Sequence, residues 1–197
     1  MDTQNKTAGE HILDVGRSLI GAQGFTALGL TQLLKVADVP KGSFYHYFAS
    51  KEAFGCSLLQ QYLAEYSQQL DAILNEEGKP ARERLMGYFS LWCSNQTSEE
   101  SKNHCLIVKL AAEVSDISDD MRTILDQGTQ MITDHLMRAI EAGHQDGSIP
   151  TSVPAAQTAA ALYQLWLGAS LMTKIKRQGA PLQEAMWMTN TLLPSSP

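Results

Sequence analysis

Five side chains able to contact nucleic acid lie within seven residues of this sequence. They are Lys41, Ser43, Tyr45, His46 and Tyr47. Ammonium and hydroxyl groups bind phosphate oxygens, and hydroxyl or imidazole groups can also reach base edges. Phe44 and Phe48, four residues apart, would face the buried side of the same short helix. The cluster therefore predicts a helix that enters a DNA groove.

Two short helices and the start of a longer one must hold this cluster in place. The first short helix is predicted from apolar residues at helical spacing, namely Leu30, Leu33, Leu34 and Ala37. Gly29 can serve as its N-cap, and Asp38-Val39-Pro40 ends it because a residue before proline leaves the helical region. Ser50 is predicted to cap a long helix over 51–74. Two short helices joined by a tight turn are typical of a helix-turn-helix.

A longer stretch, residues 10–56, matches a known pattern. The matching residues are Gly24, Phe25, Val39, Lys41, Gly42, Ser43, Tyr45, His46, Phe48, Lys51 and Glu52. On these residues the chain resembles the TetR family of bacterial one-component regulators. Leu28-Gly29, Asp38 and Pro40 depart from the family pattern, which affects helix caps and the turn. The resemblance implies an N-terminal three-helix DNA-binding domain and a C-terminal helical domain for ligand sensing and dimerisation.

The residues of this region can be given chemical roles. Lys41 and Lys51 each lie at the start of a predicted helix, where free N–H groups and an ammonium group bind phosphate. Thr31 is predicted to reach a phosphate from the first turn of its helix. The predicted DNA-binding set is Thr31, Lys41, Gly42, Ser43, Tyr45, His46, Tyr47 and Lys51, with Gly42 taken from the family pattern.

Charge is unevenly distributed along the chain. The net charge is −6 over 197 residues, but residues 1–51 carry five Lys or Arg and four Asp or Glu. The acidic excess therefore belongs to residues 52–197. A near-neutral head on an acidic body indicates DNA binding through a small set of contacts instead of a broad basic surface. We predict a DNA-binding domain over 1–51 and a regulatory and dimerisation domain over 52–197.

The rest of the chain predicts helices and no convincing strand, which gives an all-α fold of about nine helices. The predicted C-terminal helices are 80–95, 103–114, 119–145, 153–177 and 181–193, and residues 1–10 are expected to form a frayed arm. Residues 155–173 are uncharged but contain too many Gln, Ser and Thr for a membrane span. Three cysteines without a secretory context indicate free thiols in a reducing cytoplasm.

The predicted helix 153–177 is apolar over most of its circumference, so it must be covered on more than one side. The resemblance implies that the last two helices form a four-helix bundle with a second subunit. Such a homodimer would present two recognition helices to a palindromic operator. The predicted dimerisation residues are Leu162, Leu165, Gly168, Ala169 and Met172.

Two mechanisms could control DNA binding. In the first, a small apolar molecule binds reversibly in a pocket of the C-terminal domain lined by Phe89, Trp92 and Trp166. Several of the eight methionines would suit a permissive pocket of this kind. Aromatic residues at helical spacing are, however, more often ordinary core.

The second mechanism is covalent chemistry at Cys105. With Asn103 as N-cap, Cys105 would lie in the first turn of a helix, where the helix dipole and free N–H groups lower a thiol pKa. Lys109 would lie one turn further on the same face. A thiol of this kind can act as an oxidant or electrophile sensor.

A resemblance supports this second mechanism. The segment from His104 to Glu113 resembles that of the electrophile-responsive repressors of the TetR family, which answer N-ethylmaleimide, quinones and reactive aldehydes. Lys174 is predicted to tune or trap the oxidised Cys105 thiol, and Cys93 to resolve it.

Other classes of function have little support. The five histidines show no metal-ligand spacing with one another or with the cysteines, and there is no Gly-rich phosphate loop, so we expect no enzyme activity, metal or cofactor. Asp119 and Asp120 are interpreted as helix caps and not as catalytic carboxylates. A remote alternative is a helical architectural or partner-binding protein that uses the tyrosine cluster for protein contacts.

Overall fold

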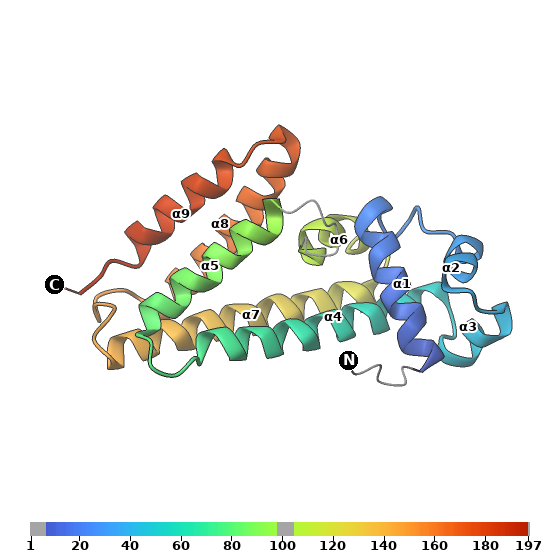
Figure 1. Cartoon of the computed structure of the whole chain (residues 1–197), viewed down its shortest axis with the longest axis horizontal. Coiled ribbons are helices and arrows are strands. Elements are labelled where there is room, and N and C mark those ends of the chain that lie inside the picture. Colours follow the sequence, from blue (N-terminus) through green and yellow to red (C-terminus); the bar gives the residue numbers. More distant parts are fainter. Residues whose placement is uncertain (1–6, 98–104, 197) are drawn as a thin grey trace. The chain divides into compact units, whose positions relative to one another are not determined.

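The computed structural model describes residues 7–97 and 105–196 of the chain. These residues form nine helices and no strand, so the predicted all-α fold is confirmed (Figure 1). The helices are α1 (Ala8–Gln23), α2 (Leu30–Ala37), α3 (Lys41–Tyr47), α4 (Lys51–Leu74), α5 (Ala81–Thr97), α6 (Leu106–Val114), α7 (Asp119–Gln145), α8 (Ala155–Lys176) and α9 (Ala180–Leu192).

The chain packs as two compact units. Unit 1 contains Met1–Leu63 and Glu99–Asp126, and unit 2 contains Ala64–Ser98 and Gln127–Pro197. Helices α4 and α7 contribute residues to both units, whereas α6 belongs to unit 1 together with α1, α2 and α3. The predicted functional boundary after residue 51 stays a prediction, because packing units and functional domains need not coincide.

Helix α1 begins earlier than the sequence suggested. The Thr7 hydroxyl accepts a hydrogen bond from the Glu10 backbone N–H at 3.2 Å, and the Glu10 carboxylate accepts one from the Thr7 N–H at 2.7 Å. This capping box satisfies backbone groups that an N-terminus otherwise leaves unpaired. The prediction of a frayed arm over 1–10 was therefore wrong for residues 8–10, which are helical; residues 1–6 lie outside the described residues.

The predicted turn of the helix-turn-helix is confirmed in detail. Gly29 is the N-cap of α2, and Asp38 ends that helix in the left-handed conformation, with φ of 51°. Pro40 is the N-cap of α3. The Ser50 hydroxyl accepts a hydrogen bond from the Ala53 N–H at 3.0 Å, so α4 begins at the predicted residue.

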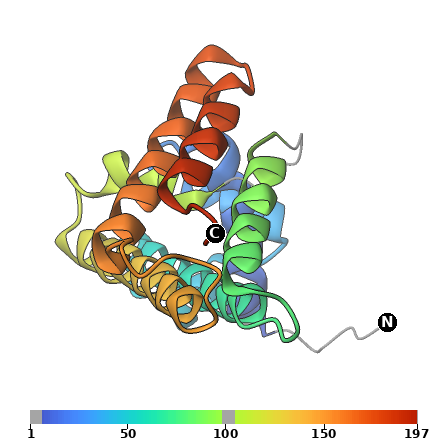
Figure 2. The same cartoon turned by 90° about the vertical axis from the view of Figure 1, so that its left-hand side faces the viewer.

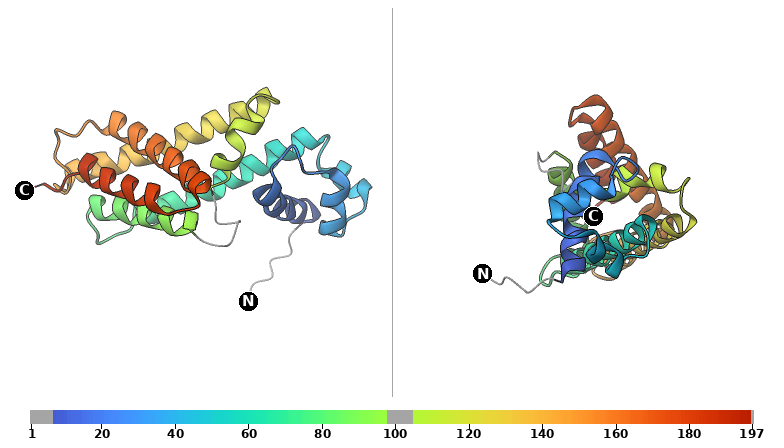
Figure 3. Two further views of the ribbon diagram at one scale, coloured as in Figure 1. Left: turned by 90° about the horizontal axis from the view of Figure 1, so that it is seen from above. Right: turned by 90° about the vertical axis from the view of Figure 1, so that its right-hand side faces the viewer.

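Three phenylalanines form the core beneath α3. Phe44, Phe48 and Phe54 are at most 5% exposed, and their ring centroids lie 5.2 to 5.7 Å apart. Gly16 of α1 meets this cluster, because a Cβ atom at Gly16 would lie 2.3 Å from the Phe54 ring. Helix α1 packs against both α2 and α3 and so holds the two short helices together (Figure 3).

Unit 2 is built around tryptophan. In this unit α8 and α9 run side by side, and α5 also packs against α9 (Figure 2). The Phe89 and Trp166 rings stack with their centroids 5.0 Å apart, and Trp92 lies 5.9 Å from Trp166. The Trp166 indole N–H donates to the Thr189 hydroxyl, and the Trp92 indole N–H donates to the Ser170 hydroxyl, both at 2.9 Å. The buried polar atoms of the two indoles are therefore satisfied.

The predicted C-terminal helices correspond to α5 to α9, with small differences at their ends. The predicted bounds of α7 are confirmed, but its capping side chain is Ser118, whose hydroxyl accepts from the Met121 N–H at 3.1 Å. Asp119 and Asp120 lie in the first turn, so their interpretation as caps was wrong. Helix α6 begins at Leu106; the predicted start at residues 103–104 lies outside the described residues.

Candidate nucleic-acid interface and thiol site

The recognition face of α3 is exposed as the sequence predicted. We use this name for Lys41, Gly42, Ser43, Tyr45, His46 and Tyr47. All of them are exposed except Ser43, which is half-buried. The two tyrosines remain about half accessible, Tyr45 at 50% and Tyr47 at 44%. Exposed hydroxyl, imidazole and ammonium groups gathered on one short helix make this face a candidate DNA contact surface.

Neighbouring groups hold the recognition face in position. The Tyr47 ring lies directly over Gly9 of α1, where a Cβ atom would approach the ring to 2.8 Å. His46 packs edge-on against Tyr47 with centroids 4.9 Å apart. The Lys41 ammonium lies 5.8 Å from the Tyr45 ring centroid. These contacts fix the rings and leave the polar tips available.

Helix α2 contributes Thr31, which is exposed in its first turn as predicted. His11 of α1 holds the other end of this helix, which was not predicted. The His11 Nε2–H donates to the Ala37 backbone carbonyl, and the two atoms are 3.0 Å apart. No local pattern reveals such a bond, because the two residues are far apart in sequence.

Lys51 was expected to offer its ammonium group to phosphate, but in the structure this group contacts the protein itself. Its ammonium donates to the Thr26 backbone carbonyl at 3.2 Å and lies 4.9 Å from the Phe25 ring centroid. Burial lowers the pKa of Lys51, and the nearby Glu113 carboxylate partly opposes that effect. Lys51 therefore fastens the turn between α1 and α2, and its contact with phosphate stays a prediction.

The Cys105 thiol lies at the start of α6. Cys105 is the N-cap of α6 and not, as predicted, a first-turn residue. The Tyr62 hydroxyl of α4 donates to the Cys105 sulfur at 3.8 Å and accepts from the Leu106 N–H at 3.3 Å. The Arg17 guanidinium of α1 lies 4.9 Å from the centroid of the same Tyr62 ring. The thiol therefore contacts a tyrosine that also meets α1.

Burial raises the pKa of the Cys105 thiol. Hydrogen bonds from the Val108 and Ile107 backbone and from the Tyr62 hydroxyl favour the thiolate but do not outweigh burial. The prediction of a lowered thiol pKa was therefore wrong. A helix N-terminus does stabilise the thiolate here, yet the loss of water around the sulfur is the larger effect.

The other predicted sensing residues have separate surroundings. The Lys109 ammonium donates to the Ala22 backbone carbonyl at the end of α1, at 3.4 Å. Lys174 is exposed in the last turn of α8, and Cys93 is half-buried in α5. Both belong to unit 2, and their predicted partnership with Cys105 stays a prediction.

The predicted pocket residues Phe89, Trp92 and Trp166 do contact one another, but they fill the core of unit 2. Their side chains are at most 5% exposed. A ligand would have to separate the stacked rings to reach them. Their part in ligand binding stays a prediction.

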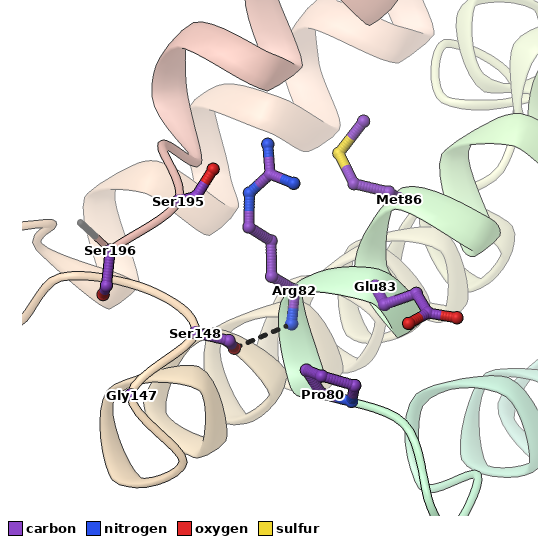
Figure 4. Close-up of a pocket in the computed structure, with 8 residues that line it drawn as sticks. All are labelled: Pro80, Arg82, Glu83, Met86, Gly147, Ser148, Ser195 and Ser196. Carbon is purple, nitrogen blue, oxygen red and sulfur yellow. Dashed lines mark hydrogen bonds between the residues drawn. The ribbon is translucent and has the colours of Figure 1, made fainter.

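A pocket of about 390 Å³ lies beside the first turn of α5 (Figure 4). It is lined by Pro80, Arg82, Glu83, Met86, Gly147, Ser148, Ser195 and Ser196. Its polar groups are used by the fold itself. The Arg82 N–H donates to the Ser148 hydroxyl at 3.1 Å, and the Arg82 guanidinium donates to the Leu193 carbonyl at 2.7 Å. Arg82, in the first turn of α5, thus anchors Leu193 at the end of α9.

Five large apolar side chains are exposed on α8 and α9, and only one of them, Met172, belongs to the predicted dimerisation set. Leu162 and Ala169 are buried within their own chain, at 0% and 8% exposure, so their assignment to dimerisation was wrong. Leu165 is half-buried, and Gly168 and Met172 are exposed. The apolar face, as we name it, consists of Leu171, Met172, Ile175, Trp187 and Met188, which are 36% to 67% exposed.

Sequence comparison assigns both parts of the chain to one family. Residues 12–54 match the model of bacterial regulatory proteins of the tetR family, and residues 81–188 match the tetracyclin repressor-like C-terminal domain. The chain belongs to the TetR family. It is thus a transcriptional regulator with a helix-turn-helix DNA-binding region, as the sequence predicted.

Individual relatives agree with this assignment. The HTH-type transcriptional repressor NemR of Escherichia coli strain K12 is 42% identical over 177 residues, which cover 90% of this chain and 89% of NemR. The HTH-type transcriptional repressor DhaR of a Mycobacterium species, strain GP1, is 30% identical and covers 95% of this chain and 93% of its own. The crystal structure of the reduced form of E. coli NemR superimposes with a TM-score of 0.90 at 41% identity, covering 95% of this chain and 97% of that chain.

Within the described residues no helix has the length and apolar character needed to cross a membrane.

Proposed function

We propose that this TetR family protein is a homodimeric repressor that leaves a palindromic operator when an electrophile or oxidant reacts with Cys105. The recognition face of α3 contacts the DNA, and the apolar face of α8 and α9 pairs with a second copy. Such a regulator acts in the cytoplasm, where bacterial DNA lies. The observation that carries the proposal is the position of Cys105, at the start of a helix in the same compact unit as α2 and α3.

The similarity to NemR supports both the repressor function and the thiol-based switch. NemR is a transcriptional repressor, and it has been crystallised in a form described as reduced. This chain is 42% identical to NemR, and its half-buried Cys105 thiol accepts a hydrogen bond from Tyr62, which supports a thiol-based switch.

The chemistry of the proposed switch is an addition at sulfur. The Cys105 thiolate adds to the carbon–carbon double bond of N-ethylmaleimide, a carbon–sulfur bond forms, and the neighbouring carbon takes up a proton from water. Because burial raises the pKa of Cys105, the thiolate is a minor species at neutral pH. The rate of alkylation should therefore rise with pH through the neutral range.

Operator release by purified protein tests the proposal. The operator is selected from random DNA, and wild type is compared with Cys105→Ser while N-ethylmaleimide and then hypochlorite are titrated. Wild type should be released and Cys105→Ser should stay bound. Cys56→Ser, which removes another half-buried thiol, is the matched control and should be released like wild type.

Two other results would contradict the proposal. Equal release of wild type and Cys105→Ser would return Cys105 to a structural role and favour reversible binding of a small apolar ligand. Failure to select any short palindrome would favour the remote alternative of a partner-binding helical protein.

A further inference from the structure

One carboxylate joins α6 to the turn between α1 and α2. Glu113, near the end of α6, accepts hydrogen bonds from the backbone N–H groups of Phe25, at 3.1 Å, and Thr26, at 2.5 Å. Both oxygens of the carboxylate are used, which fixes its orientation as well as its distance. The two bonds bridge parts of unit 1 that are 87 and 88 residues apart in sequence.

Gly24 makes this close approach possible. Its φ of 92° belongs to a region that other residues rarely adopt, and a Cβ atom there would lie 2.9 Å from the Glu113 carboxylate. A side chain at this position would therefore strain the backbone and push the carboxylate away. The absence of a side chain at Gly24 therefore leaves the space that the Glu113 carboxylate occupies.

Two lysines also bind backbone carbonyls in this region, one at the end of α1 and one in the turn that follows. The Lys109 ammonium, one helical turn before Glu113, donates to the Ala22 carbonyl at 3.4 Å. The Lys51 ammonium, at the start of α4, donates to the Thr26 carbonyl at 3.2 Å. The end of α1 and the following turn are thus bound to α6 by Glu113 and Lys109 and to α4 by Lys51.

The other end of α6 carries the thiol. Cys105 precedes Glu113 by eight residues, which is about 12 Å along a helix. Between them Leu106, Ile107 and Leu110 are buried, at 4% exposure or less. A short helix packed along one side moves as a body when one of its ends is displaced, because close-packed interiors transmit displacement.

An adduct on the Cys105 sulfur must displace a neighbouring group of the protein. The thiol is half-buried and its sulfur accepts a hydrogen bond from the Tyr62 hydroxyl, so a maleimide ring bonded to that sulfur has to displace the Tyr62 hydroxyl or the start of α6. Either movement acts on α6, because the Leu106 N–H is bonded to the same tyrosine hydroxyl.

We infer that Glu113 is a positioning residue that couples the Cys105 thiol to the DNA-binding helices. A shift of α6 pulls on the Phe25 and Thr26 N–H groups, and the α1–α2 turn carries the shift into α2 and the recognition face. This inference rests on the proposed thiol switch and names the contact through which it acts.

The charge of Glu113 agrees with this role. Burial alone would raise the pKa of Glu113, but hydrogen bonds from Thr26 and Phe25 and the charge of Lys109 outweigh it and lower the pKa. The carboxylate is therefore held ionised at neutral pH, with the full strength of a charge-assisted hydrogen bond.

The test compares operator affinity before and after complete alkylation of Cys105, in wild type, Glu113→Ala and Glu113→Gln. The ratio of the two dissociation constants measures the coupling, and ratios of about 5- to 150-fold are typical of allosteric proteins. In Glu113→Ala the ratio should fall toward one, while mass spectrometry shows a full adduct at Cys105. Glu113→Gln keeps one acceptor oxygen and should recover part of the ratio. Glu141→Ala, at an exposed glutamate of α7, is the matched control and should keep the wild-type ratio.

A structural readout accompanies the affinities. Hydrogen exchange of the Phe25 and Thr26 amides should be slow in unmodified wild type, faster after alkylation, and already fast in Glu113→Ala. A purely structural role for Glu113 would lower thermal stability and speed exchange of these amides in Glu113→Ala, but would leave the coupling ratio as in wild type.

The outcomes separate the two proposals. A wild-type ratio of one with a full adduct would overturn the thiol switch and, with it, this inference. A large ratio that Glu113→Ala retains would overturn only the role of Glu113. A large ratio lost in Glu113→Ala and partly restored in Glu113→Gln would establish that role.

Discussion

Each compact unit has an aromatic core with an exposed face beside it, but the polar atoms are arranged in opposite ways. In unit 1 the aromatic cluster beneath α3 consists of three phenyl rings, those of Phe44, Phe48 and Phe54, and the hydroxyl, imidazole and ammonium groups of α3 lie outside on the recognition face. In unit 2 the indole N–H groups of Trp92 and Trp166 are paired inside, and the apolar face lies outside.

The difference indicates two kinds of partner. A face of polar groups on a rigid apolar base suits an anionic polymer whose phosphates and base edges accept and donate hydrogen bonds. A face of Leu, Ile, Met and Trp side chains suits a protein surface that excludes water. In the proposed function one unit binds DNA and the other binds a second copy of the chain, and three substitutions test this contrast.

The largest effect is expected from Trp166→Ala. Loss of a fully buried tryptophan, with its stack on Phe89 and its bond to Thr189, should cost about 3–5 kcal/mol of unfolding free energy. Denaturant unfolding measures the loss. The comparison variant is Trp187→Ala, which removes a tryptophan that is 67% exposed on the apolar face. If the proposed dimer forms through this face, the cost in apparent unfolding free energy should shrink as the protein is diluted below its dimer dissociation constant, because binding of a second copy stabilises the folded chain only while the dimer persists. Similar, concentration-independent losses in both variants would contradict the distinction between core and face.

Ile175→Asp tests the apolar face directly. Ile175 is 64% exposed in the single chain, so a charge there should leave the fold intact but oppose burial against a second copy. We expect dimerisation to weaken by about 2 kcal/mol or more, roughly 30-fold, which sedimentation equilibrium measures. Leu91→Asp makes the same kind of change on α5, where the leucine is 45% exposed. A dimer as stable in Ile175→Asp as in Leu91→Asp would place the interface elsewhere.

The smallest effect is expected from Lys41→Ala. If Lys41 binds one phosphate, its loss should weaken selected and random DNA alike and reduce the salt dependence of binding by about one charge. Binding titrations at several salt concentrations give this slope. Lys79→Ala removes an exposed lysine of unit 2 that pairs with Glu76 at 2.8 Å, and it should leave the slope unchanged. An unchanged slope in Lys41→Ala would remove Lys41 from the set of phosphate contacts.

Much of the fold could be predicted because its signals are local. Gly29, Pro40 and Ser50 mark helix ends through the conformation or the hydrogen bonds of a few neighbouring residues, and each lies where it was expected. The start of α1 was missed because the Thr7–Glu10 capping box lies in a stretch whose polar composition also suits a frayed arm.

The site was harder to predict because its decisive contacts are long-range. Helical spacing shows that α8 is apolar but not which side its own chain covers, so Leu162 and Ala169 were assigned to the wrong surface. The pKa of Cys105 depends on burial, which no spacing reveals. The role of Glu113 could not be predicted, because its bonds to Phe25 and Thr26 arise only from folding.

The unequal exposure of the three tryptophans gives the protein an internal optical signal. Trp92 and Trp166 are at most 5% exposed, whereas Trp187 is 67% exposed on the apolar face. Indole fluorescence shifts to shorter wavelength when water leaves the ring, so pairing of two apolar faces would change the emission of Trp187 and leave that of the other two nearly constant. A dilution series followed by fluorescence alone would then report assembly, with no label attached to the chain.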